Sequence, residues 1–144
     1  MDRFETFSLA LFNMSRYWNR LAAEEMEKYG LKGAHAFYLV TILRHDGDVT
    51  ASQLCELCGK DKADVSRAVA KMEEYRLLER TGANPYRAKL RLTEQGIAAA
   101  QAVRETAGTI VDRVGGDLTE EKRTVFYEVL ASVTANLEKL CKEI

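Results

Sequence analysis

The stretch at residues 60–80, KDKADVSRAVAKMEEYRLLER, decides the fold. Val65, Val69 and Met72 follow one another at intervals of four and three residues, which predicts an amphipathic helix over about 61–75. Asp61 is placed to cap its first turn. The opposite face of this helix carries small or cationic side chains, namely Asp64, Ser66, Arg67, Ala70 and Lys71. A face that slim and basic has the shape of a helix that enters the DNA major groove.

The residues on either side predict a helix-turn-helix followed by a β-hairpin wing. Upstream, SQLCELCG forms a short helix that begins at Thr50 or Ser52 and ends at Gly59, before the tight turn CGKDK. Downstream, LLERTGANPYRAKLRLT changes to an alternating pattern in which Leu90 and Leu92 face the core. The turn residues between its two extended runs are Gly82, Asn84 and Pro85.

This arrangement predicts a role in DNA binding for each exposed residue of the helix and wing. Arg67 can read guanine with two hydrogen bonds, and Ser66 can contact a base edge or a phosphate. Asp64 can accept from cytosine, pair with a neighbouring cation, or interact with the helix dipole. Tyr86 can pack on a sugar. The candidate phosphate and wing contacts are Lys62, Lys71, Arg87, Lys89 and Arg91. The alternative is a solvated helix face, with hairpin charges that only protect an exposed edge.

The charge distribution also indicates a polyanionic partner, double-stranded DNA. The chain has a net charge of −1, yet residues 60–91 contain nine Lys and Arg residues against five Asp and Glu. A single positive segment in a nearly neutral protein indicates that one face binds a polyanion. The alternative is chance clustering of Lys and Arg on a solvated surface.

Long helices are predicted on both sides of this core. Phe4, Phe7 and Leu11 begin an apolar stripe over residues 1–30, and Val133, Leu137 and Leu140 belong to a last helix at about 119–142. A helix at about 34–45 and one from Thr93 to about 113 complete the order. The fold class is mostly α with a small β-hairpin wing. The apolar stripes of the first and last helices are larger than the small central region can cover. This favours a homodimer in which a second copy of the chain covers them.

Length and composition set the broad class. The 144 residues predict a single domain, in which 1–30 and 114–144 dimerise, 34–92 form the winged helix-turn-helix, and 93–113 connect them. No apolar run is long enough to cross a bilayer. Three cysteines and no export signal indicate the cytoplasm. The chain has no phosphate loop, nucleophile elbow or H-E-x-x-H, so we expect no enzyme activity and no cofactor.

Residues 49–96 resemble the core of the MarR family of bacterial winged-helix regulators. The resemblance rests on DKADVSRAVAKME, LLER and LRLTEQG. It implies a homodimer formed by terminal helices, a pseudo-palindromic operator, and repression relieved by a small ligand or an oxidant. Ser66 and Arg67 match the family's recognition-helix positions, and Arg87 is the nearest match to its wing arginine. Family wings have Asp two residues before that arginine, whereas this chain has Pro85.

Two further sets of residues suggest a signal. Cys55 and Cys58 form a C-x-x-C that either packs as small core residues or senses oxidants. A metal site is not expected, because His35, His45 and Cys141 lack paired spacing. The resemblance implies a cleft for a small aromatic effector, with Trp18, His35 and Tyr38 as candidate contacts; the alternative places Trp18 and Tyr38 in the core and His35 at a helix start.

The sequence is therefore compatible with three functions. The first is a sequence-specific DNA-binding regulator, with repression as the expected outcome. The second is a winged-helix protein-interaction module, which would show little salt dependence and no preference for duplex DNA. The third is a thiol-based regulator or oxidoreductase that uses Cys55 and Cys58, although no βαβ pattern surrounds them.

Overall fold

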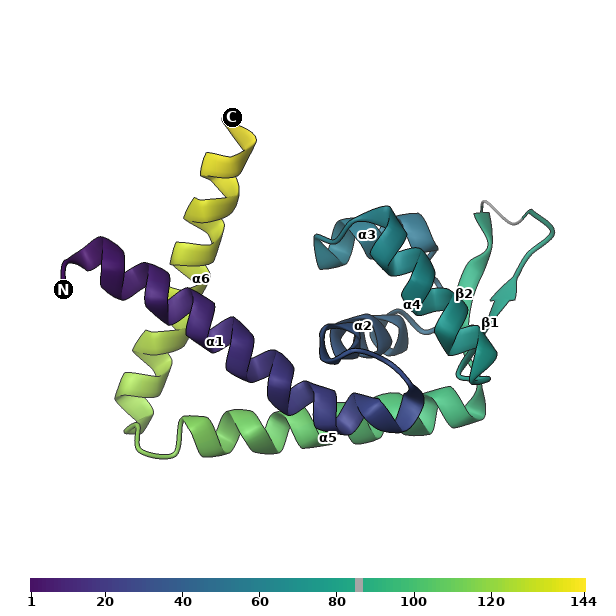
Figure 1. The fold of residues 1–144 in the computed structure, drawn as a ribbon, viewed down its shortest axis with the longest axis horizontal. Helices are drawn as coiled ribbons and strands as arrows, with labels where there is room; N and C mark the ends of the chain where they lie inside the picture. The colour runs from purple at the N-terminus through teal and green to yellow at the C-terminus, as the bar shows by residue number, and fades with distance from the viewer. Residues whose placement is uncertain (85–86) are drawn as a thin grey trace. The chain divides into compact units, whose positions relative to one another are not determined.

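A computed structural model describes residues 1–84 and 87–144 (Figure 1). It confirms a mostly helical fold with one two-stranded antiparallel hairpin. Contacts within the chain divide it into two units, residues 1–107 and 108–144. The elements are α1 (Arg3–Met26), η1 (Glu27–Tyr29), η2 (Gly33–His35), α2 (Ala36–His45), α3 (Ala51–Cys58), α4 (Lys62–Glu74), β1 (Leu78–Thr81), β2 (Lys89–Leu92), α5 (Glu94–Val114) and α6 (Glu120–Lys142).

Local capping residues set both ends of the first helix. Asp2 accepts a hydrogen bond from the Glu5 backbone N–H, and the Glu5 carboxylate accepts one from the Asp2 backbone N–H. At the other end α1 continues into the 3₁₀ turn η1, which stops at Gly30 with a left-handed φ of 63°. The expected end of the first helix near Gly30 is therefore confirmed, with the last turn tightened.

The helix-turn-helix consists of α3 and α4, packed beside α2 and the hairpin (Figure 1). Thr50 caps α3 and exchanges hydrogen bonds with Gln53, and Gly59 ends the helix with a φ of 60°. Asp61 then caps α4 by accepting from the Asp64 backbone N–H at 2.8 Å. The buried side of α4 consists of Val65, Ala68, Val69 and Met72. The predicted caps and apolar stripe of this helix are confirmed.

The hairpin is anchored to the start of α3. Its strands pair in antiparallel register, with Leu78 opposite Leu92 and Arg80 opposite Leu90. Leu90 and Leu92 are buried, as expected from their alternation with charged residues. The Leu90 backbone N–H donates to the Val49 carbonyl at 2.8 Å, and Thr50 forms an isolated bridge with Lys89. The base of the hairpin is thus hydrogen-bonded to the segment that leads into α3.

A second anchor joins the start of α5 to the segment before β1. The Thr93 hydroxyl accepts from the Gly96 backbone N–H at 3.0 Å and donates to the Arg76 carbonyl at 2.7 Å. Gly96 lies against the backbone of Leu77, so closely that an added Cβ would sit 1.8 Å from the Leu77 carbonyl oxygen. Only glycine fits at this contact, because the obstructing atoms are backbone.

The second unit contains the end of α5 and the whole of α6. Thr119 caps α6 by accepting from the Lys122 backbone N–H. The large apolar side chains of α6 are exposed rather than packed, including Val125, Val129, Leu137 and Leu140. Among the described residues, no helix is both long and apolar enough to span a membrane.

Candidate nucleic-acid interface

The exposed face of α4 has the character expected from the sequence. Ser66, Arg67, Ala70 and Lys71 are exposed, while the four apolar residues behind them are fully buried. Lys62 at the start of the helix is exposed as well. The face therefore presents short side chains and cationic side chains, with no bulky apolar group between them. That profile suits close approach to a groove whose walls carry phosphates.

The cations on this face are only loosely restrained. The Arg67 side chain is 66% exposed, and its guanidinium lies 3.8 Å from an Asp64 carboxylate oxygen. The Lys71 side chain is 45% exposed, lies 3.9 Å from Glu74, and sits 5.8 Å from the centre of the Tyr75 ring. Exposed pairs at such distances contribute little free energy, so both cations can exchange their partner for a phosphate or a base.

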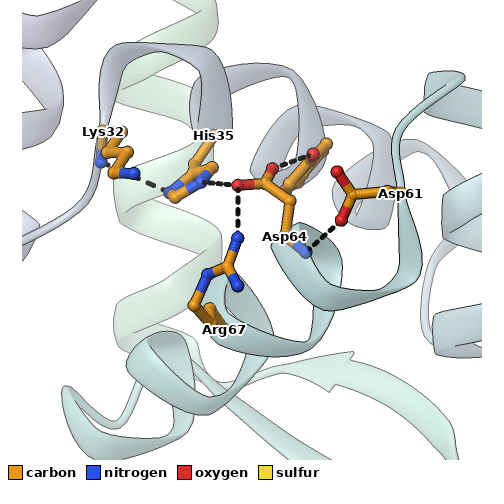
Figure 2. A network of polar contacts seen from close by, with 6 residues as sticks. Lys32, His35, Asp61, Asp64 and Arg67 are labelled. Carbon is orange, nitrogen blue, oxygen red and sulfur yellow. Dashed lines mark hydrogen bonds and ion pairs between the residues drawn. The ribbon is translucent and has the colours of Figure 1, made fainter.

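Asp64 is turned toward the body of the protein (Figure 2). Its Oδ2 atom accepts from the Tyr38 hydroxyl at 2.5 Å, and its Oδ1 atom faces His35 Nε2 at 3.5 Å and Arg67 at 3.8 Å. The Tyr38 hydrogen bond is the main cause that lowers the pKa of Asp64, so the group is a carboxylate at neutral pH. Of the three roles that the sequence suggests for Asp64, the structure shows the pairing with a neighbouring cation, and the position of Asp64 in the first turn of α4 also suits the helix dipole.

His35 is held as a neutral ring between two partners. Its Nδ1 atom accepts from the Lys32 backbone N–H at 3.3 Å (Figure 2), which leaves the proton on Nε2, the atom that faces Asp64. The ring also stacks on Tyr38, with 5.4 Å between the ring centres. Burial is the main cause that lowers the pKa of His35, so the ring is uncharged at neutral pH.

The wing residues differ in solvent exposure and in whether they already form an ion pair. Arg87 and Arg91 are exposed, but Lys89 is half-buried, and its ammonium group lies 2.9 Å from the Asp48 carboxylate. Lys89 and Arg91 belong to β2, whereas Arg87 precedes the strand. Tyr86 and Pro85, the other wing residues considered, lie outside the described residues.

The two cysteines of the C-x-x-C pack against the protein interior, as structural residues do. Cys55 and Cys58 are free, half-buried, and in contact with the hydrophobic core. Burial is the main cause that raises the pKa of the Cys58 thiol, which disfavours the reactive thiolate. Among the residues that the structure describes, no group of three or more His, Cys, Asp or Glu side chains could hold a metal ion.

The candidate effector contacts do not lie in one lined cavity. Trp18 on α1 is 42% exposed, and Tyr38 is fully buried. His35 lines an open hollow of about 390 Å³ between residues 30–35 and the face of α4, together with Asp64 and Arg67. Trp18 and Tyr38 are not among the residues that line it. The sequence did not indicate that His35 and Tyr38 would meet Asp64, because 29 and 26 residues separate them from it.

Comparisons with known proteins agree on one family. A model of the MarR family matches residues 29–86. The fold is similar to a MarR transcriptional regulator from Methanosarcina mazei Go1, with 20% identity, a TM-score of 0.83, and coverage of 94% of this chain and 99% of that chain. It is also similar to the S. aureus MepR–DNA complex, with 19% identity, a TM-score of 0.80, and coverage of 94% and 99%. A third similar structure is NMB1585, a MarR family regulator from Neisseria meningitidis, with 19% identity, a TM-score of 0.76, and coverage of 99% of each chain. A search of curated proteins gives no match.

Proposed function

We propose that this chain is a member of the MarR family and that it is a sequence-specific DNA-binding transcriptional regulator. The family model that matches residues 29–86 and the similar winged-helix structures support this proposal. The observation that carries the proposal is the exposed, slim and cationic face of α4, formed by Ser66, Arg67, Ala70 and Lys71. The similar structure of a MepR–DNA complex supports a nucleic-acid partner for this fold. We further propose that the protein is a repressor that binds a pseudo-palindromic operator as a homodimer. No enzyme activity is part of the proposal.

Each residue of the α4 face has a proposed role that follows from its chemistry. Arg67 contacts guanine O6 and N7, because its planar guanidinium donates two parallel hydrogen bonds. Ser66 binds a base edge or a phosphate, and Ala70 leaves room for the groove floor. Lys62 and Lys71 bind phosphates, which position the protein without reading sequence. Asp64 supports this face from behind rather than meeting the DNA, because its carboxylate is bonded to Tyr38.

The wing supplies a second, weaker set of proposed contacts. Arg91 and Arg87 are exposed and can reach the phosphate backbone or the adjacent minor groove, where arginine is favoured. Lys89 must first leave Asp48, so its contribution is smaller than that of the two arginines. Tyr86 remains a proposed sugar contact.

We expect Arg67→Ala to remove base discrimination. The substitution should reduce the preference for operator over unrelated duplex by about 1–3 kcal/mol, the usual value of a bidentate arginine–guanine contact. Lys71→Ala is the matched control on the same face, and it should weaken all duplexes similarly because phosphates carry no sequence. The operator is first recovered by selecting bound fragments of the source genome, and affinities are then measured by fluorescence anisotropy. An Arg67→Ala variant with an unchanged preference would contradict the base-reading role.

The proposed homodimer would use residues 1–30 and 114–144, with 34–92 as the DNA-binding core and 93–113 as the connecting helix. The exposed apolar side chains of the terminal helices support this dimer. Phe4 on α1 is 75% exposed, and Leu140 on α6 is 59% exposed. A two-fold dimer would place two α4 helices about 34–36 Å apart, one helical turn of DNA.

We expect sedimentation equilibrium to give twice the chain mass of 16.2 kDa. Val129→Asp should shift the protein toward the monomer, because the substitution would bury an unpaired carboxylate in an apolar interface. Glu128→Gln is the control, since it changes a neighbouring exposed polar residue of the same helix. A monomeric wild-type protein at micromolar concentration would refute the dimer.

A small aromatic effector completes the proposed function. Of the three candidate contacts Trp18, His35 and Tyr38, His35 alone lines the hollow beside α4, so we propose His35 as the effector contact. A redox signal through Cys55 and Cys58 is the less favoured route, because the raised pKa of the Cys58 thiol opposes oxidation by peroxide.

A further inference from the structure

Tyr38 is joined to the DNA-facing arginine through a single carboxylate. The buried Tyr38 hydroxyl donates to Oδ2 of Asp64 at 2.5 Å. The other oxygen, Oδ1, lies 3.8 Å from the Arg67 guanidinium (Figure 2). Tyr38 is on α2 and the other two residues are on α4, so the contact links the α4 face to the core behind it.

We propose that Tyr38 is a positioning residue for DNA recognition, whose hydroxyl restrains Asp64 so that Arg67 stays free to bind a base. The inference rests on the proposed function, because it assigns a purpose to the geometry of a DNA-reading arginine. Neither Tyr38 nor Asp64 touches the DNA in this proposal.

An arginine that lies beside a carboxylate usually forms an ion pair with it. Asp64 and Arg67 are three residues apart on one helix, a spacing at which opposite charges meet. Left to themselves, a guanidinium and a carboxylate favour a two-oxygen pair with parallel hydrogen bonds. Such a pair would occupy the same N–H groups that a guanine needs. In this structure the contact involves one oxygen, at a distance too long for a hydrogen bond.

The Tyr38 hydroxyl is what prevents the two-oxygen pair. It occupies Oδ2 with a short hydrogen bond to a charged acceptor, which is among the stronger kinds of hydrogen bond in proteins. His35 supports the same orientation from the Oδ1 side, at 3.5 Å. Packing does not restrain Arg67 in their place, because Arg67 borders the open hollow and is 66% exposed. The direction of the Asp64 carboxylate therefore controls where the guanidinium rests.

The first test is Tyr38→Phe, which removes the hydroxyl and keeps the buried ring. We expect the ratio of operator affinity to unrelated-duplex affinity to fall by about 2-fold to 30-fold, the range typical of residues that act without touching the ligand. Tyr29→Phe is the matched control, since Tyr29 is a half-buried tyrosine packed against the same core. It should leave the ratio unchanged.

Two double variants separate positioning from a purely structural role. Adding Asp64→Asn to Tyr38→Phe should restore the ratio, because a neutral amide cannot hold Arg67 in an ion pair. In an Arg67→Ala background, Tyr38→Phe should have no further effect on the ratio. A ratio that Tyr38→Phe leaves unchanged, or that Asp64→Asn fails to restore, would overturn the proposal.

A measurement on the free protein keeps this proposal distinct from the proposed function. We expect the Arg67 side-chain N–H signals in ¹⁵N NMR to show slower solvent exchange in Tyr38→Phe than in the wild type, because the guanidinium becomes paired with Asp64. Tyr29→Phe should not change them. If the wild type shows no sequence preference, the proposed function fails, while slower exchange still supports the Tyr38 restraint. Unchanged Arg67 signals in Tyr38→Phe would refute that restraint whatever the protein binds.

Discussion

Raising the salt concentration from 50 mM to 200 mM is expected to weaken operator binding by about a thousandfold or more. The exposed cations Lys62, Lys71, Arg87 and Arg91 would each displace a condensed counterion from the DNA backbone, and a dimer doubles their number. Six to ten phosphate contacts, a rough count for such a dimer, correspond to losses of about 10³–10⁵ over this range. The measurement is fluorescence anisotropy with a labelled operator at a series of salt concentrations.

The slope of that titration can be assigned to individual residues. Lys71→Ala should reduce the slope of log affinity against log salt by about two in a dimer, one for each lost phosphate contact. Tyr75→Phe is a suitable control, because it leaves the charge of the α4 face unchanged. A flat salt response without duplex preference would contradict DNA binding and favour the protein-interaction module instead.

Among the Gly→Ala substitutions, we expect Gly96→Ala to be the most destabilising. The new Cβ would lie 1.8 Å from the Leu77 carbonyl oxygen and 2.8 Å from its carbonyl carbon. Neither atom can move aside alone, because the Thr93 backbone N–H donates to that same oxygen at 3.0 Å. The start of α5 and the segment before β1 would have to separate. We estimate a loss of about 3 kcal/mol in the free energy of unfolding, at the upper end for added atoms in a packed site.

Gly108→Ala is the matched control on the same helix. Beyond the neighbouring backbone of its own helix, Gly108 has no atom within 4 Å of an added Cβ, so the substitution meets no obstacle. It should stabilise the protein by up to about 1 kcal/mol, because alanine has the higher helix propensity. Urea denaturation followed by circular dichroism measures both variants. Equal stability of the Gly96 and Gly108 variants would contradict the close approach at Leu77.

The helix boundaries were predictable because they depend on nearby residues. Asp61, Thr93 and Gly59 each act on a backbone group within a few positions in the chain, and the structure shows the capping or helix-ending roles expected of them. The buried face of α4 was equally predictable from the sequence, since Val65, Val69 and Met72 repeat with the period of a helix.

The polar partners at the site were not predictable, because they come from distant parts of the sequence. Asp48 forms an ion pair with Lys89 across a separation of 41 residues, and the sequence near either residue does not predict this pair. The sequence suggests that Tyr38 is either a ligand contact or a core residue, and the structure places it in the core with its hydroxyl on Asp64. A periodic pattern indicates which side of a helix is buried, but it does not indicate which hydroxyl reaches which carboxylate.

The bond from the Leu90 N–H to the Val49 carbonyl ties strand β2 to the segment that leads into the helix-turn-helix. This bond and the Thr50–Lys89 bridge both restrain bending at the base of the hairpin. In the proposed DNA complex, the distance between the α4 contact and the Arg91 contact would then change little. Under the proposed function, DNA whose groove spacing differs from that distance would have to bend or twist to fit, so the stiffness of the duplex would contribute to target selection at base pairs that no side chain contacts.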